Sequence, residues 1–413
     1  MRRRVEPHGR RRSAFAGRFG ETGVEPRTPG SESSRELPRE SRTENPKSKI
    51  AGFSLITNLA CPSTNPARPL AKELNPMTSC LRFPSLLAAL GLAAVAGATT
   101  PRSEIRIRDP FVLPDRATQT YYIYGTTTAG IFDGGIERKA VMVFKTKDLQ
   151  QWEDPVPVWE VPADHWGRET VWAPEVHSYR GRYYLFVTIT SKDKLPTPPD
   201  RPQNVRRGTE ILVADSPLGP FQPLGRGPQT PADWMARDGS LWVEDGTPYM
   251  VFCHEWAQIT DGSFDVVRLS EDLAHAVSPP QLLFHASEAP WVRCRGDIGE
   301  LYQGKRYHAY VSDGNWLHRT KTGTLLMLWS SYGPAKYAVG IARSKSGSVF
   351  GPWEQLPDPL WSDDGGHPML FETFDHRLVM VIHQPNRRVE RARFFEVEDL
   401  GDTLRLKGEL LGR

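Results

Sequence analysis

The stretch that decides the fold is VWAPEVHSYRGRYYLFVT, residues 171–188. It opens with an acidic turn and an apolar strand, and it continues into a strand rich in aromatic residues. The same order of features occurs five times after residue 103, at a spacing of roughly 55 to 75 residues, which is typical of propellers and other repeat arrays. Long helical periodicity is absent, so we predict an all-β protein.

Five openings with matching second strands indicate five four-stranded blades around one axis, a five-bladed β-propeller. The openings are RDPF from Arg108, WAPEV from Trp172, RDGSL from Arg237, SDGNW from Ser312 and GGHPM from Gly365. In such a fold the innermost strand of each blade starts at the central channel. We therefore expect five ionisable side chains at equivalent places to converge there, namely Asp109, Glu175, Asp238, Asp313 and His367.

Charge is distributed unevenly along the 413 residues. Residues 1–76 carry 15 Lys/Arg and 8 Asp/Glu and show no apolar periodicity, so we expect a disordered or wrongly annotated extension. From residue 103 onward there are 35 Lys/Arg and 41 Asp/Glu, a net charge of −6. The overall charge of +3 therefore belongs to the N-terminal segment, and the folded part gives no sign of nucleic-acid binding.

Residues 77–98 have the layout of a secretory signal peptide. The segment starts at Met77, carries Arg82, continues into an apolar run and ends in small residues near Ala96 to Ala98. The run is too short to span a bilayer, so we expect no membrane anchor. We infer that translation starts at Met77, that residues 103–413 form the catalytic domain, and that the protein is secreted or periplasmic.

The part of the chain after the signal contains two cysteines, Cys253 and Cys294, without CxxC spacing. A metal cluster is therefore not expected. One disulfide and two buried thiols both remain open, because an exported protein can hold either.

A ring of carboxylates in a propeller channel meets the needs of glycoside hydrolysis. One carboxylic acid protonates the leaving oxygen, and one carboxylate activates water or attacks the sugar. A third carboxylate nearby raises the pKa of the acid by like-charge repulsion. Aromatic residues beside the ring can stack on sugar faces, and the candidates are Trp172, Trp242 and Trp316.

The five blade openings, taken in order, resemble the motifs of glycoside hydrolase family 43 over residues 105–390. The resemblance implies a five-bladed propeller that inverts configuration, acts on arabinose- or xylose-containing saccharides and needs no cofactor. It implies Asp109 as the general base and Asp238 as the residue that tunes the pKa of the acid. His367 would lie beside a calcium or sodium ion in the channel, through water, and Glu175 would line the channel.

The general acid is where the sequence departs from the family, which mostly carries Glu-Gly-Pro at the start of blade four. Here the motif is Asp313-Gly314-Asn315, and aspartate is shorter by one methylene group. We expect Asp313 to be the acid. Glu300, in the segment just upstream, is the alternative donor, and loss of the acid also remains open.

Two other functions compete with this one. A retaining fructan hydrolase is also a five-bladed propeller with Arg-Asp-Pro, but there that motif lies mid-chain and a Glu-Cys pair follows. A sugar-binding propeller without turnover would explain the changed acid motif. We expect a carbohydrate partner and a monomer, and the loops that close the channel decide the exact sugar and endo or exo action.

Overall fold

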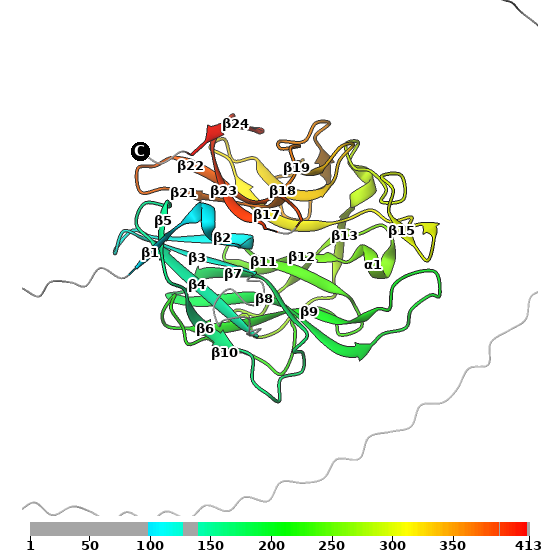
Figure 1. Ribbon diagram of the computed structural model, residues 1–413, viewed down its shortest axis with the longest axis horizontal. Helices are drawn as coiled ribbons and strands as arrows, with labels where there is room; N and C mark the ends of the chain where they lie inside the picture. Colours follow the sequence, from blue (N-terminus) through cyan, green and yellow to red (C-terminus); the bar gives the residue numbers. More distant parts are fainter. Residues whose placement is uncertain (1–97, 127–138, 388, 411–413) are drawn as a thin grey trace, which may run out of the picture. The chain divides into compact units, whose positions relative to one another are not determined.

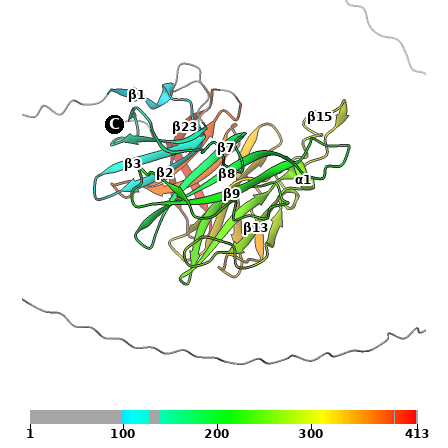
Figure 2. The ribbon, with the colours of Figure 1, turned by 90° about the horizontal axis from the view of Figure 1, so that it is seen from below.

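The predicted repeats form five antiparallel sheets, one for each blade. The computed structural model describes residues 98–126, 139–387 and 389–410, and nearly all of its regular elements are strands. Figure 1 shows the sheets grouped around the innermost strands, and Figure 2 shows the same arrangement from below. The prediction of an all-β, five-bladed propeller is confirmed. The predicted N-terminal extension and signal peptide lie before residue 99, almost wholly outside the described residues.

The strands follow the blade order along the chain. Blade 1 contains β1 (Thr99–Pro101), β2 (Arg108–Asp115), β3 (Thr120–Thr126), β4 (Ala140–Thr146), β5 (Gln151–Glu153) and β6 (Val156–Glu160). Blade 2 contains β7 (Thr170–Tyr179), β8 (Arg182–Lys194), β9 (Val205–Ala214) and β10 (Gln222–Pro223). Blade 3 contains β11 (Ala236–Glu244), β12 (Thr247–His254), β13 (Ser263–Arg268) and β14 (Gln281–His285).

Blade 4 contains β17 (Asp313–Arg319), β18 (Leu325–Tyr332), β19 (Tyr337–Ser344) and β20 (Trp353–Gln355). Blade 5 contains β21 (Gly366–Glu372), β22 (Leu378–Gln384), β23 (Arg391–Asp399) and β24 (Leu404–Glu409). Between blades 3 and 4 lies a small hairpin of β15 (Leu301–Tyr302) and β16 (Lys305–Arg306). The helical pieces are η1 (Arg102–Glu104), α1 (Trp256–Ile259) and η2 (Ala286–Glu288).

The five innermost strands, β2, β7, β11, β17 and β21, contact one another in a ring that closes between β21 and β2. The ends of the domain reinforce this closure. The Arg102 guanidinium donates to the Leu410 carbonyl at 3.1 Å, and the Arg391 guanidinium donates to the Ser103 carbonyl at 2.8 Å. These contacts tie the first blade to the last, although the two are far apart in sequence.

Apolar side chains between the blades form the core. Trp152, Phe186, Phe252 and Trp329 are among the largest fully buried side chains, and they come from the second or outer strands of four different blades. Burial of such rings is the main stabilising term for a sheet that must be covered on both faces. In the described part of the chain, no helix is both long enough and apolar enough to cross a membrane.

One irregularity recurs in every blade and decides where the polar side chains point. Each innermost strand has a register shift near its start, at Arg108/Phe111, Trp172/Glu175, Arg237/Ser240, Asp313/Trp316 and Gly366/Met369. The residue after the first member of each pair has a left-handed backbone, with φ between 43° and 56° at Asp109, Ala173, Asp238, Gly314 and His367. Such a bulge bends the strand and redirects a side chain, which is why bulges are common beside active sites.

Candidate active site

The repeated bulges open a pocket of about 290 Å³ where the innermost strands begin. Several blades contribute to its walls, and the groups are mostly charged or aromatic. The lining residues are Arg108, Asp109, Thr126, Trp172, Arg237, Asp238, Glu255, Trp256, Arg295, Val311, Asp313, Tyr332, Tyr337 and Asn386. A volume of this size suits one or two sugar rings better than a large ligand.

Asp109 is a buried carboxylate surrounded by donors and positive charge. The Thr126 hydroxyl donates to its Oδ2 at 3.0 Å, and its Oδ1 lies 3.3 Å from Nδ1 of His367. Arg108 Nε lies 3.5 Å from the same Oδ1. Burial alone raises the pKa of Asp109, but the charges of His367 and Arg108 outweigh it and hold the pKa well below its ordinary value. Asp109 is therefore ionised and able to accept a proton from water.

Asp238 is also a buried carboxyl, but its pKa is shifted in the opposite direction from that of Asp109. It is 3 % exposed, and its Oδ2 accepts hydrogen bonds from Arg237 Nη1 at 3.0 Å and from the Gly314 backbone N–H at 3.3 Å. Burial raises the pKa of Asp238 to about 7, against the opposing charges of Arg237 and His367. The negative charges of Asp313 and Asp109 add to the rise. This carboxyl can therefore hold a proton near neutral pH.

Asp313 lies beside Asp238 and shares its arginine. Arg237 Nη1 donates to Asp313 Oδ1 at 2.6 Å, and the Tyr337 hydroxyl donates to Asp313 Oδ2. Burial raises the pKa of Asp313, but the charges of Arg237 and His367 overcome that effect and leave the pKa below its ordinary value. Both oxygens of Asp313 are occupied by donors, so the ionised form is favoured over the protonated form expected of an acid.

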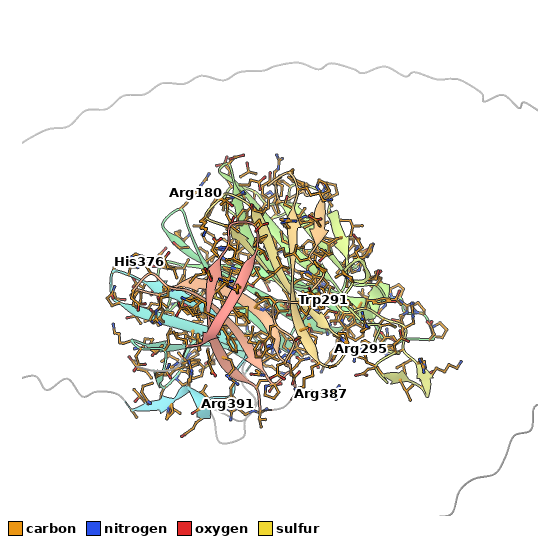
Figure 3. The ribbon with its side chains drawn as sticks, turned by 90° about the horizontal axis from the view of Figure 1, so that it is seen from above. Arg180, Trp291, Arg295, His376, Arg387 and Arg391 are labelled. Carbon is orange, nitrogen blue, oxygen red and sulfur yellow. The ribbon has the colours of Figure 1, made fainter. Side chains whose placement is uncertain are left out.

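Glu300 does not line the pocket. Its carboxylate pairs with Arg295 at 3.1 Å and with Arg387 at 3.6 Å. Figure 3 shows these two arginines toward one edge of the propeller, with Arg180 at the opposite edge. Glu300 therefore reaches the site only through Arg295, and its contacts favour a role in holding the rim.

His367 lies among the three aspartates. It is buried, and its Nδ1 lies 3.3 Å from Asp109 Oδ1 and 3.8 Å from Asp313 Oδ1. Burial lowers the pKa of His367, but the charge of Asp109 and its hydrogen bond dominate and raise the pKa to about 9. At neutral pH the ring is an imidazolium that stabilises the neighbouring carboxylates.

The expected calcium or sodium ion can be tested against these groups. Asp238, Asp313 and His367 each offer a ligand atom, and the three atoms lie within 4.8 Å of one another. Direct coordination does not suit them, because the imidazole would have to lose its proton and the Arg237 guanidinium already contacts both carboxylates. An ion held through water beside His367 stays a prediction.

The structure corrects the predicted equivalence of the five ionisable residues. The left-handed position holds Asp109, Asp238 and His367, but in blade 2 it holds Ala173 and in blade 4 it holds Gly314. Asp313 stands one residue earlier and still reaches the pocket. Glu175 stands two residues later, beyond the bulge, and its carboxylate pairs with His177 at 2.8 Å. Glu175, predicted to line the channel, is therefore not among the residues that line this pocket.

The three predicted tryptophans also differ in whether they line the pocket. Trp172 lines the pocket, with the Arg207 guanidinium 4.6 Å from its ring centre. Trp316 packs on His177 and lines a different hollow of about 470 Å³, formed by residues farther along the innermost strands. Trp242 donates to Glu244 at 3.1 Å, also beyond the bulge. Only Trp172 of the three is placed to contact a ligand in the pocket.

Several residues that line the pocket lie outside the blade openings and were therefore not predicted. Glu255 and Trp256 follow β12, and Tyr337 begins β19. Glu255 pairs with Arg207, which in turn packs on Trp172. The signal was available: a Glu-Trp pair directly after the apolar strand YMVFCH places polar and aromatic groups at a strand end. The ends of second strands meet the channel as the openings do.

The two cysteines in the described part of the chain, Cys253 and Cys294, are free and buried. Cys253 contacts Asn315 Oδ1 at 3.5 Å, and Cys294 contacts His308 Nδ1 at 3.4 Å. The alternative of two buried thiols is the one that the structure shows.

Comparison with known proteins agrees with this geometry. Residues 98–404 match the family model described as glycosyl hydrolases family 43. An endo-arabinase from Bacteroides thetaiotaomicron VPI-5482 is 39% identical, with a TM-score of 0.64, and the match covers 73% of this chain and 98% of that one.

Two more distant structures share the fold. A thermostable family-43 glycoside hydrolase is 20% identical, with a TM-score of 0.60 and coverage of 75% and 96%. An α-L-arabinofuranosidase from Lactobacillus brevis is 14% identical, with a TM-score of 0.56 and coverage of 73% and 93%. A search of curated proteins gave no match. The match to the family model spans most of the chain, and the chain belongs to glycoside hydrolase family 43.

Proposed function

We propose that the protein hydrolyses glycosidic bonds in arabinose-containing saccharides by a single displacement that inverts the anomeric centre. The observation that carries the proposal is the contrast between two buried carboxyls of one small pocket. The pKa of Asp109 lies well below its ordinary value, whereas the pKa of Asp238 is raised to about 7. A glycosidase needs this pairing of an ionised base and a protonated acid.

In the proposed reaction, Asp109 takes a proton from a water molecule as the water oxygen attacks the anomeric carbon. The bond from that carbon to the leaving oxygen breaks, and a carboxyl of the Asp238–Asp313 pair gives its proton to the leaving oxygen. The base gains one proton and the acid loses one, so the charge of the site is unchanged. Solvent water then takes the proton from Asp109 and returns a proton to the acid.

The proton of the pair rests on Asp238 in this proposal, which changes the assignment expected from sequence. Asp313 accepts from Arg237 and Tyr337 through its two oxygens, whereas Asp238 Oδ1 has no protein partner among the described residues. The negative charge of Asp313 in turn helps to keep the proton on Asp238. The two aspartates act as one acid unit.

We propose arabinose and not xylose as the sugar because the solved structure that is 39% identical is described as an endo-arabinase. The test is proton NMR of the sugar first released from a linear α-1,5-arabino-oligosaccharide, beside a matched xylo-oligosaccharide. Release of the inverted anomer from the arabino-oligosaccharide is expected. A retained anomer would rule out the single displacement and favour the fructan-hydrolase type of reaction. Binding of either sugar without turnover would favour the sugar-binding propeller instead.

A further inference from the structure

A second hollow lies beside the active-site pocket, on the other side of a wall made by Trp256 and Tyr307. Its volume is about 570 Å³, and the active-site pocket measures about 290 Å³. Trp256 lines the active-site pocket, Tyr307 lines the second hollow, and their ring centres are 5.6 Å apart. Figures 1 and 2 both show the β15 hairpin beside α1, and the hollow is lined by this hairpin, by Thr260 just after α1 and by the loop between β8 and β9.

The walls of the second hollow combine positive charge with aromatic faces. They come from the loop between β8 and β9, the end of α1 and the β15–β16 hairpin, and the residues that matter are Arg201, Tyr302, Lys305, Arg306, Tyr307 and His308. Tyr302 and Tyr307 lie with ring centres 6.1 Å apart. Tyrosine rings of this kind offer flat faces to sugars and hydroxyls to their oxygens.

Acidic side chains neutralise little of this charge. Asp200 is the one carboxylate among the lining residues, and it lies 3.6 Å from Arg201 Nε. Arg306 faces Asp297 at 3.5 Å, but both side chains are mostly exposed to water, where such a pair is weak. Lys305 forms no ion pair with any described residue. The hollow therefore keeps a net positive charge.

Two buried polar atoms of wall residues make no hydrogen bond in the described part of the chain. The Tyr307 hydroxyl and Arg201 Nε are both buried and make no hydrogen bond there. Leaving such groups without a hydrogen bond is costly, so a water or ligand atom that reached them would be stabilised. The donors exposed to the hollow are those of Lys305 and Arg306, so it suits a ligand rich in acceptor oxygens.

We propose that this hollow binds a saccharide that carries carboxylate groups, that is, a chain containing uronic acid. Guanidinium and ammonium groups bind carboxylates, and the two tyrosines provide the sugar-binding faces. A neutral arabinan segment has no carboxylate to meet this charge. The site would thus hold an acidic part of a polysaccharide while a neutral part enters the active-site pocket. Binding here does not require hydrolysis, so the inference goes beyond the proposed function.

The test uses the full-length protein carrying Asp109→Asn, and trigalacturonate as the probe, measured by isothermal titration calorimetry. Saturable binding that weakens as NaCl increases is expected, with much weaker binding of xylotriose. The double variant Lys305→Ala/Arg306→Ala should bind trigalacturonate at least tenfold more weakly. Arg180→Ala/Arg182→Ala is the matched control, because it removes two exposed positive charges at another edge of the propeller and should leave binding unchanged.

The proposal is overturned if trigalacturonate does not saturate, or if both double variants bind it equally well. It is also overturned if xylotriose binds as tightly, or if inorganic phosphate displaces the probe at similar concentrations, which would indicate a general anion site. In the protein with Asp109 intact, Lys305→Ala/Arg306→Ala should hydrolyse a small aryl arabinofuranoside at the normal rate. A protein that binds trigalacturonate but hydrolyses no glycoside would refute the proposed function alone.

Discussion

Arg237 donates to Asp313 through Nη1 at 2.6 Å, and the same nitrogen lies 3.0 Å from Oδ2 of Asp238. One guanidinium nitrogen therefore joins the two members of the acid unit. Its other terminal nitrogen donates to the Ser312 carbonyl at 2.6 Å, which fixes the plane of the group. Because Arg237 precedes Asp238 in sequence, the bulge in β11 sets the positions of both residues.

The first prediction is that Arg237→Met moves the alkaline limb of the pH–rate profile to higher pH. Arg237 lowers the pKa of Asp238, which is about 7 with the arginine present, so removing the charge lets that pKa rise further. Activity that requires protonated Asp238 is lost as pH rises through this pKa. We expect the limb near pH 7 in the unmodified protein and at higher pH in Arg237→Met, measured as kcat/KM against pH.

Arg237→Lys is the control for charge. It keeps the positive charge, so its alkaline limb should stay near that of the unmodified protein even if its rate falls. Breaking a buried ion pair can cost about 3 to 5 kcal/mol of folding stability, so thermal unfolding must show that Arg237→Met is folded. A limb that stays in place in folded Arg237→Met would contradict the assigned coupling.

The second prediction concerns Gly314, the blade-4 residue at the left-handed position. A Cβ atom there would lie 2.7 Å from the ring and the backbone of His367, and φ is 49°. Gly314→Ala should therefore displace His367 and lower both stability and activity, with a cost in unfolding free energy above about 1 kcal/mol.

Gly246→Ala separates backbone strain from the clash. Gly246 has φ of 78°, and a Cβ atom there would meet nothing within 4 Å. It should reproduce the strain without affecting kcat/KM. Equal activity of the two alanine variants would mean that His367 does not need its present position.

The fold could be predicted from the sequence because its signal is repeated. An apolar second strand follows each of the five openings, four of these strands contain aromatic residues, and the innermost strands form a ring as expected. The bulges could not be predicted, because local residue preferences do not show where two residues of one strand, such as β7, face a single residue of its neighbour β8. Asp109 and Asp238 lie among the residues that line the pocket, whereas Glu175, two residues after the left-handed position of β7, does not.

The candidate site was predicted in part for a related reason. Residues that enter the pocket from blade openings were found by comparing repeats. Tyr337 and Glu255 enter from other strand ends, and their roles depend on partners distant in sequence, such as the contact of Tyr337 with Asp313. The protonation of Asp238 depends on the combined effect of burial and neighbouring charges on its pKa, and no sequence motif predicts that combined effect.

The third prediction concerns export. The apolar run after Met77 motivates the proposal that the protein is secreted or periplasmic and that mature protein begins near residue 97 or 99. Expression of the complete 413-residue coding sequence, followed by N-terminal sequencing of the exported protein, tests it. A mature species that retains Arg2 to Pro76 would refute both the signal peptide and the start at Met77.

The fourth prediction concerns the base. Asp109→Asn removes the group that accepts the proton of water, so the rate should fall roughly 10²- to 10⁴-fold on every substrate, whatever its leaving group. Sugar binding should persist, because the walls of the pocket are otherwise intact. An equal rate for Asp109→Asn and the unmodified protein would remove Asp109 from the reaction.

The last prediction identifies the proton donor by its leaving-group dependence. A donor matters most when the leaving oxygen is a poor leaving group, as in a natural sugar–sugar linkage, and little when it is a nitrophenolate. We expect Asp238→Asn to abolish hydrolysis of arabinobiose while a nitrophenyl arabinofuranoside is still cleaved. Both substrates have the same sugar at the reacting centre, so the comparison isolates protonation.

Asp313→Asn should behave differently. Removing its negative charge lowers the pKa of Asp238, because Asp313 raises that pKa. The alkaline limb should move to lower pH, and the loss of rate should be similar on both substrates below that limb. Glu300→Gln should leave both substrates nearly unaffected, since Glu300 contacts the rim arginines Arg295 and Arg387 and does not line the pocket. Leaving-group dependence in Asp313→Asn alone would return the donor role to Asp313, and in Glu300→Gln alone would assign it to the upstream segment.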